Sequence, residues 1–330
     1  MRFVPIHEIR DNMVLAKNVQ DEYGRTIITA GSHVYSKYIP RLKNFGIYYI
    51  CISDDWSDGL DIEPQIEDKT ITASIQALEA LDLDKIFDCA SSIVDELCSS
   101  IELMYDFETL RDYDENTYHH SVNVAINAVT LGIGESLNYK RLNNLAVGAM
   151  LHDIGKQKVP LEILNKAGRL NDEEMEIIRR HPEDGYKILN QDILVSASIK
   201  EIVHQHHENW DGTGYPRGLK EKGVYDLAAM VHICDVYDAL ISKRAYKEAF
   251  TFSNTIDILR KGNGTMFSPY YLRSFFKYVP IYHKGTEVVL SNNQKALVIK
   301  NNRGNMLKPT VRLQSGTEID LREEDLSIIS

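Results

Sequence analysis

Hydrophobic residues recur at three- and four-residue intervals through the middle of the chain, from about Ile71 to Tyr278. The intervals are most regular in Ile86–Leu103, Val122–Leu131 and Leu142–Leu151. Because an α-helix turns once in 3.6 residues, this spacing gathers apolar side chains on one face that must be buried. We therefore predict one helical domain over residues 67–279.

The first 66 residues follow a different pattern. Apolar and polar positions alternate in Asn12–Ala16 and again in Thr26–Thr29, and Glu22–Arg25 between them is typical of a turn, so a β-hairpin is predicted. A helix over Ser36–Asn44 and a strand over Ile47–Ile52 would complete a small α+β domain. The acidic, apolar-poor stretch that follows, up to about Glu67, is typical of a linker.

The pattern changes again after Pro280. Short β-like runs occur at Glu287–Leu290, Ala296–Ile299 and Thr310–Leu313, separated by Asn and Gly residues. We expect a small β-rich appendage over residues 280–330. The predicted fold class is thus mainly α, with a helical bundle core between two small β-containing units.

One helical stripe has two interpretations. Ile86, Cys89, Ile93, Leu97 and Leu103 recur on one face of a single predicted helix. The stripe either packs into the core, which we favour, or pairs two subunits of a homodimer.

Composition narrows the class of protein. The 330 residues carry a net charge of −11. This charge argues against binding of a nucleic-acid polymer, because clustered cations must neutralise the phosphates in such a complex. The four cysteines match neither a disulfide framework nor a zinc-binding CxxC pattern. No run of residues has the composition of a signal peptide or the length of a membrane span, so we expect a cytoplasmic protein without membrane insertion.

The stretch HHENWDGTGYP, residues 206–216, concentrates groups that bind metals. His206 and His207 are adjacent, and a neutral imidazole can bind an ion through one nitrogen while a neighbouring acceptor holds the other. The glycines and proline that follow are equally typical of a surface turn. The stretch alone leaves both interpretations open.

Other metal-binding side chains are spread over the helical segment. His152 and Asp153 follow an apolar helix that we expect to be buried, and burying an unpaired carboxylate costs several kcal/mol, so Asp153 favours a cation. With His120, His181 and Asp235, these residues could supply two divalent ions with one carboxylate bridging them. Spacing alone does not choose the ligands, because His119, His204 and His232 have equal claims.

The motifs occur in a recognisable order: H-S at 120, H-D-x-G-K at 152, H-P at 181, H-H-E-x-W-D-G-x-G-Y-P at 206 and D-V-Y-D-A-L at 235. From about Tyr118 to Phe267 the sequence resembles the HD-GYP family, a branch of the HD phosphohydrolases that degrades the bacterial messenger cyclic di-GMP. The resemblance implies an HD-type helical bundle. Carried over by position, it implies the metal ligands His120, His152, Asp153, His181, His206, His207 and Asp235.

The resemblance also implies how these ligands are shared. Asp153 would bridge two ions; His152 and Asp235 would complete one, and His181, His206 and His207 would hold the other. Mixed nitrogen and oxygen ligands favour Fe or Mn, with Zn, Co or Ni as alternatives. Some family members bind a third ion through a Glu four residues before the first histidine. Asn116 stands there in this chain, with Glu115 one step away, so we expect two ions.

For the chemistry we expect a water bridging the two ions to attack phosphorus in line with the leaving ribose oxygen. Lys156 is expected to bind a phosphate oxygen, and Arg244 and Lys247 to hold the substrate phosphates; solvated helix-surface cations are the alternative for all three. Tyr215 would form a pocket wall. Glu208, Asp211 and Asp238 are expected to orient the ligands or the loop.

The predicted function is hydrolysis of cyclic di-GMP to pGpG, with slower conversion to GMP. One alternative is an HD phosphohydrolase that acts on another cyclic dinucleotide or nucleotide. Another is a signalling adaptor that binds cyclic di-GMP and protein partners without catalysis.

Overall fold

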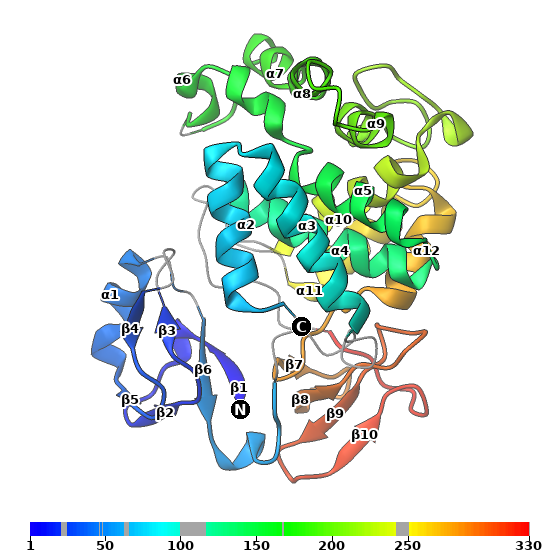
Figure 1. Ribbon diagram of the computed structural model, residues 1–330. Helices are drawn as coiled ribbons and strands as arrows, with labels where there is room; N and C mark the ends of the chain where they lie inside the picture. The colour runs from blue at the N-terminus through cyan, green and yellow to red at the C-terminus, as the bar shows by residue number, and fades with distance from the viewer. Residues whose placement is uncertain are drawn as a thin grey trace.

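The computed structural model describes residues 1–20, 25–45, 47, 49–62, 66–99, 117–166, 168–241 and 251–329. Figure 1 shows a central body of helices above two small sheets, one near each end of the chain. The chain is mainly α with a small antiparallel sheet at each end, as the sequence predicts.

The N-terminal sheet has four antiparallel strands in the order β1-β6-β2-β5. Ser36–Tyr38 forms a 3-10 turn that leads into α1, which packs beside the sheet over an apolar cluster that includes Val34, Leu42 and Ile52. The strands and helix are β1 (Arg2–Pro5), β2 (Met13–Leu15), β5 (His33–Val34), β6 (Tyr49–Ser53) and α1 (Ile39–Asn44).

The predicted hairpin pairs differently from expectation. Strand β4 (Thr26–Ile28) pairs with β3 (Val19–Gln20), in a separate two-stranded sheet, and not with the Asn12–Ala16 stretch. Strand β2 within that stretch instead lies between β5 and β6. Alternation identified the strands but could not identify their partners, because several strands present a similar pattern. The predicted turn falls largely in residues 21–24, outside the described residues.

The central body consists of helices whose starts are marked in the sequence. Asn138, Ser196 and Thr251 each accept a hydrogen bond from a backbone N–H in the first turn of the following helix, and Asn171 with Glu174 forms a capping box. The helices are α2 (Asp68–Ala80), α3 (Leu83–Ser99), α4 (Thr117–Gly134), α5 (Tyr139–Met150), α6 (Leu161–Leu164), α7 (Asp172–Ile178), α8 (His181–Leu189), α9 (Ala197–Gln205), α10 (Asp226–Ile241), α11 (Phe252–Lys261) and α12 (Pro269–Tyr278).

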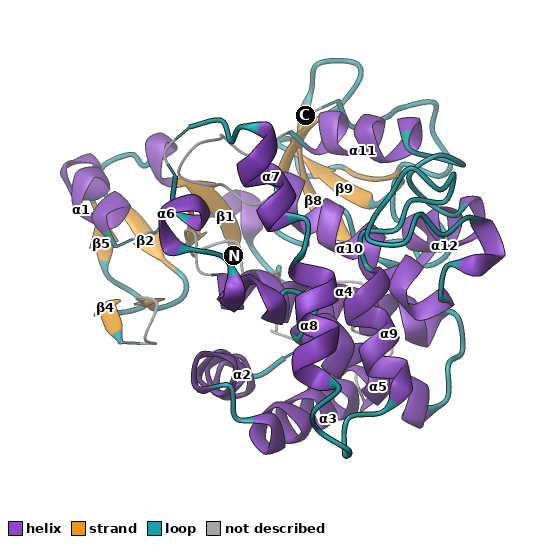
Figure 2. Cartoon of the chain, turned by 90° about the horizontal axis from the view of Figure 1, so that it is seen from above, coloured by secondary structure: helices purple, strands orange, loops and turns teal. Residues whose placement is uncertain are grey.

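Helix α4 lies at the centre and packs against α5, α10, α2, α3 and α12. Its apolar residues, among them Val122, Ala125 and Val129, are fully buried on several faces, as expected of a helix enclosed by others. Figure 2 shows the helical body from above, where α8 and α9 lie over it and α9 contacts α5 and α10. Among the described helices, none is both long enough and apolar enough to cross a bilayer.

The α3 stripe lies in the core. Ile86, Ile93 and Leu97 are fully buried within the chain, and Cys89 is nearly so. Leu103 lies outside the described residues. The core interpretation therefore accounts for the described part of the stripe without a second subunit.

The C-terminal sheet has the antiparallel order β10-β9-β8-β7. Its first three strands in the chain coincide with the three predicted runs, whereas Glu318–Asp320 is short and was not predicted. The strands are β7 (Glu287–Val289), β8 (Lys295–Lys300), β9 (Thr310–Leu313) and β10 (Glu318–Asp320).

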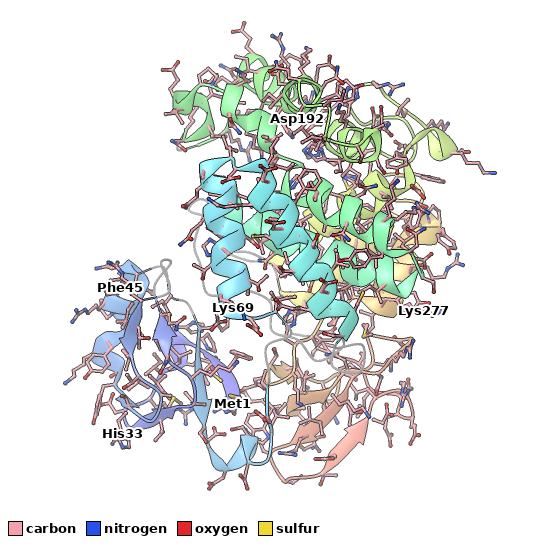
Figure 3. All side chains as sticks on the ribbon, viewed as in Figure 1. Met1, His33, Phe45, Lys69, Asp192 and Lys277 are labelled. Atoms are coloured by element: carbon pink, nitrogen blue, oxygen red, sulfur yellow. The ribbon has the colours of Figure 1, made fainter. Side chains whose placement is uncertain are left out.

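The two sheets are joined by the first residues of the chain. The Phe3 N–H donates to the Gly285 carbonyl at 2.9 Å, and Arg2 binds both Asp54 (2.7 Å) and Glu287 (3.2 Å). Figure 3 shows the labelled Met1 between the two sheets, where its side chain packs on a small apolar cluster that includes Leu60 and Leu297. The stretch expected to be a linker thus contributes buried side chains to this junction.

Replacing Asp54 by Asn should weaken the junction by about 1 kcal/mol at neutral pH, because the amide loses the ion pair with Arg2. Burial disfavours the Asp54 carboxylate, but hydrogen bonds from Arg2 and Ser57 outweigh it and lower the pKa below 3.8. Its contribution is therefore complete above pH 3.8 and is lost as the pH falls through the lowered pKa.

The measurement is urea unfolding followed by Trp56 fluorescence, since the Arg2 guanidinium lies 5.2 Å from the Trp56 ring. A Trp210→Phe background removes the second of the two tryptophans. Exposed Asp61→Asn serves as the control. An Asp54→Asn effect of the same size at pH 3 and pH 7 would contradict the assignment.

Candidate metal centre

Three histidines of the site are held by the ends of three helices. His152 follows α5, His181 follows α7 and begins α8, and His206 follows α9. The Nδ1 atom of each lies within 2.8 Å of a backbone carbonyl oxygen three residues earlier; the acceptors are Ala149 (2.7 Å), Ile178 (2.8 Å) and Val203 (2.7 Å). Carbonyls in the last turn of a helix lack an intrahelical donor, so the imidazole N–H satisfies them.

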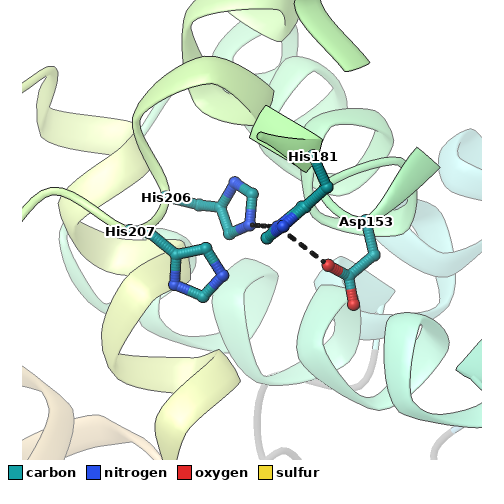
Figure 4. A group of neighbouring side chains, drawn as sticks. All are labelled: Asp153, His181, His206 and His207. Atoms are coloured by element: carbon teal, nitrogen blue, oxygen red, sulfur yellow. Dashed lines mark hydrogen bonds and ion pairs between the residues drawn. The ribbon is translucent and has the colours of Figure 1, made fainter. Parts of the chain in front are cut away.

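These bonds fix which nitrogen faces the centre. With the Nδ1 proton donated to the backbone, a neutral ring carries its lone pair on Nε2. Burial lowers the pKa of His181 and lowers that of His206 well below the usual range, which keeps both rings neutral. Figure 4 shows their Nε2 atoms facing each other, 3.1 Å apart. Two lone pairs at that distance repel, and a cation between them would convert the repulsion into binding.

Asp153 lies at the middle of the cluster. Its Oδ1 is 3.3 Å from His181 Nε2, and its Oδ2 is 3.3 Å from His152 Nε2 and 2.6 Å from Lys156 Nζ. Burial alone would raise the pKa of this carboxyl, but the positive charge of Lys156 outweighs burial and holds the pKa well below its usual range. Asp153 is therefore an anion in a nearly closed environment.

The residues fit a bound cation. His152 Nε2 and Asp153 Oδ1 are buried, yet neither forms a hydrogen bond with the described residues. An unsatisfied buried carboxylate oxygen costs several kcal/mol, and a divalent ion bound by imidazole nitrogen and carboxylate oxygen would remove that cost.

His120 on α4 lies between two aspartates of α10. Its Nδ1 is 2.7 Å from Asp238 Oδ2 and its Nε2 is 3.0 Å from Asp235 Oδ1. Burial opposes protonation of this ring, but the two carboxylates outweigh burial and raise the pKa of His120 to about 9. An ion that bound His120 and Asp235 would have to displace the proton between them.

The ligand atoms fall into groups of a size suited to an ion. Within each group they lie no more than 4.8 Å apart. One group contains Asp153, His181, His206 and His207, and a second contains His120, His152 and Asp153. A third contains His207, His232 and Asp235. All seven ligands expected from the sequence are thus brought together, with Asp153 common to the first two groups.

The loop after His207 is held by its own side chains. Glu208 is 2 % exposed, and its carboxylate accepts the backbone N–H groups of Arg217 (2.7 Å) and Leu219 (2.8 Å). Asp211 accepts from the backbone and hydroxyl of Thr213 at 2.9 and 2.6 Å. Neither carboxylate belongs to a ligand group. Both therefore shape the loop.

Tyr215 forms a wall beside the cluster. Its ring stacks on His207 with a centroid distance of 4.8 Å and an interplanar angle of 27°. Gly214 must lack a side chain, because an added Cβ would collide with the Asn209 nitrogen and the His207 carbonyl. The Arg179 guanidinium lies 5.8 Å from the Tyr215 ring, a contact that the sequence did not indicate, because Arg179 belongs to none of the motifs.

The structure distinguishes three histidines, His119, His204 and His232, that spacing along the sequence could not rank as metal ligands. His204 turns away from the cluster; its Nε2 is 2.8 Å from Glu183 and its ring stacks near Tyr186. His119 belongs to none of the ligand groups, whereas His232 belongs to one. Arg244, Lys247 and Asn116 lie outside the described residues, so their expected roles stay predictions.

Comparison with known proteins agrees with the fold and the motifs. Residues 107–270 match the HD domain family. A cyclic di-GMP phosphodiesterase of Pseudomonas aeruginosa is 37% identical over 228 residues, which is 68% of this chain and 55% of the relative. A 3'3'-cGAMP-specific phosphodiesterase of Vibrio cholerae is 32% identical over 185 residues, 56% of this chain and 35% of that relative. The chain thus spans about half the length of the first relative and about a third of the length of the second.

A solved structure supports the fold. An HDG"Y"P protein from Bdellovibrio bacteriovorus aligns with a TM-score of 0.55 at 19% identity, covering 83% of this chain and 97% of that one. The helical fold, the matched region and the histidine and aspartate cluster define an HD domain, a class that implies binding of divalent metal. With the H-H-E-x-W-D-G-x-G-Y-P segment, the chain belongs to the HD-GYP branch of that family.

Replacing Glu208 by Gln should loosen the loop, because the neutral amide keeps one acceptor oxygen for two N–H groups. The loss of a charge-assisted bond, about 1.5–3 kcal/mol, predicts at least roughly tenfold faster hydrogen exchange at the Arg217 and Leu219 amides. Exchange measured by NMR or mass spectrometry tests this, with exposed Glu176→Gln as the control. Unchanged exchange at both amides would refute the role given to Glu208.

Proposed function

We propose that this chain is a metal-dependent phosphodiesterase that hydrolyses cyclic di-GMP to pGpG. The observation that carries the proposal is the set of imidazole Nε2 atoms turned toward the Asp153 carboxylate, with the two facing lone pairs of His181 and His206 3.1 Å apart. Such a site favours a cation over a proton or a water. The relatives supply the substrate class, since they are named for hydrolysis of cyclic dinucleotides.

We assign two ions to the centre, with Asp153 shared between them. His120, His152 and Asp235 would hold one ion, and His181, His206 and His207 the other. Asp153 groups with His120 and His152 as well as with the three histidines of the second ion, and Asp235 contacts His120 at 3.0 Å. The donors are imidazole nitrogens and carboxylate oxygens, which favours Fe or Mn, with Zn, Co or Ni as alternatives. Two ions so placed would supply Lewis acidity and an activated water for attack on phosphorus.

Three further residues would bind the substrate or orient a metal ligand. Lys156 is partly exposed and ends 2.6 Å from Asp153, so its ammonium is within reach of a phosphate oxygen placed at the centre. Asp238 orients His120 through its bond to Nδ1. Tyr215 provides an aromatic face next to His207, against which a purine base or the ribose could rest.

A second candidate substrate is 3'3'-cGAMP, which one relative is named for. It differs from cyclic di-GMP only in one base, so the metal centre would treat its phosphodiester alike. Discrimination depends on base contacts, which the metal cluster does not provide.

The first test is turnover of a panel of cyclic dinucleotides by chain loaded separately with Fe, Mn, Zn, Co or Ni, with products separated by chromatography. Preference for cyclic di-GMP with pGpG as main product is the expected outcome. Asp153→Asn should lower kcat by about 10³-fold or more, since it removes several kcal/mol of transition-state stabilisation. Exposed Asp172→Asn on α7 is the matched control. Preference for a substrate without guanine, or full activity in Asp153→Asn, would refute the proposal.

A second prediction concerns stability. An ion that binds only the folded site at 100 times its dissociation constant stabilises the chain by about 2.7 kcal/mol. Adding Mn²⁺ to chelator-treated chain should therefore raise Tm by about 4 °C, measured by scanning calorimetry. Asp153→Asn should lose most of this shift while Asp172→Asn keeps it. A wild-type Tm that does not respond to any of the five metals would argue against the centre.

A further inference from the structure

Helix α10 carries a row of polar side chains on a buried face. The helix is otherwise apolar and almost wholly buried. His232, Asp235 and Asp238 are 5 %, 8 % and 1 % exposed, and their spacing of three residues places them on one side of the helix. Asp235 and Asp238 face His120. His232 therefore extends the same row by one turn.

His232 has binding capacity that the fold does not use. Its ring packs on Phe267 on one side (5.3 Å between centroids) and lies 6.4 Å from the His207 ring on another. The ring faces the backbone of His206. However, neither ring nitrogen reaches hydrogen-bond geometry with any described residue, although both are buried. A core histidine kept for packing alone would leave this polarity unsatisfied at a cost of about 1–3 kcal/mol.

The unsatisfied ring points to a ligand group. Donor atoms of His232, His207 and Asp235 lie within 4.8 Å of one another. Metal–ligand bonds of about 2.0–2.2 Å hold ligand atoms up to about 4.4 Å apart, so small side-chain movements would close the three around an ion. Helical bundles also bind metals through a carboxylate and a histidine three residues apart on one helix, the spacing of His232 and Asp235.

We propose that His232 is a further metal ligand, which binds a divalent transition-metal ion together with His207 and Asp235 on the α10 side of the centre. Because a neutral imidazole has one lone pair, His207 would then bind this ion in place of the ion held by His181 and His206. The inference rests on the proposed metal centre but not on its substrate. It adds a ligand outside the seven implied by the family motifs. The donor set of two imidazoles and one carboxylate suits Co²⁺, Zn²⁺, Mn²⁺ or Fe²⁺.

The probe is Co²⁺, titrated into chelator-treated full-length chain, with visible absorption reporting the ligand field and elemental analysis reporting ions per chain. His232→Leu keeps the volume and removes the ligand, and should weaken binding of one Co²⁺ at least about tenfold with a change in the visible bands. His232→Cys should add a sulfur-to-cobalt charge-transfer band in the near ultraviolet, absent from wild type.

His204 provides the matched control, since it is a buried histidine of α9 that is bonded to Glu183 away from the centre. His204→Leu and His204→Cys should leave the cobalt spectrum and affinity unchanged. Circular dichroism of the metal-free variants confirms folding.

The proposal is overturned if His232→Leu binds cobalt as wild type does and His232→Cys shows no charge-transfer band. It is also overturned if binding weakens without either spectral change, because His232 would then only position its neighbours. Wild-type chain that binds cobalt but hydrolyses no cyclic dinucleotide would refute the proposed function and leave this test intact. Wild-type chain that binds no cobalt would refute both.

Discussion

The centre depends on one repeated interaction, the hydrogen bond from a histidine Nδ1 to the carbonyl three residues earlier at the end of a helix. It occurs at His152, His181 and His206. Each bond gives a donor to a carbonyl at the end of a helix, where the regular i+4 donor is missing, and directs Nε2 toward Asp153. The negative ends of the α5 and α9 dipoles also lie near the cluster, which favours a cation there. The hydrogen bonds that end these helices thus also orient the nitrogens that would bind a metal.

Close backbone contact brings these helix ends together. A Cβ on Gly155 would collide with the carbonyl of His181, and one on Gly214 with the carbonyl of His207. Gly155 therefore allows the segment after Asp153 to pack against the start of α8, and Gly214 allows the loop to fold back under the His207 and Tyr215 stack. The glycines of both motifs are thus explained by the lack of space for a side chain.

Much of this arrangement could be predicted from the sequence. The helical period located the central body, the β-like runs located three strands of the last sheet, and the ordered motifs selected the residues that now surround Asp153. The sequence did not reveal the partner of β4, because strand pairing is not encoded by alternation alone. Nor did it reveal the Arg2–Asp54–Glu287 junction, which joins residues nearly a whole chain apart. It left His119, His204 and His232 equivalent, because only the direction of each side chain distinguishes them.

The charge of the centre resolves an apparent conflict between an acidic chain and the anionic substrate that we propose for it. The net charge of −11 repels a cyclic dinucleotide at long range, and Asp153, Asp235 and Asp238 would repel its phosphates at short range. Burial keeps His181 and His206 neutral, so the described cations at the cluster are Lys156 and protonated His120. The proposed pair of divalent ions carries more positive charge than those three carboxylates carry negative charge, even after His120 loses its proton. Metal binding would therefore reverse the sign of the local field, so that substrate affinity should require a loaded centre.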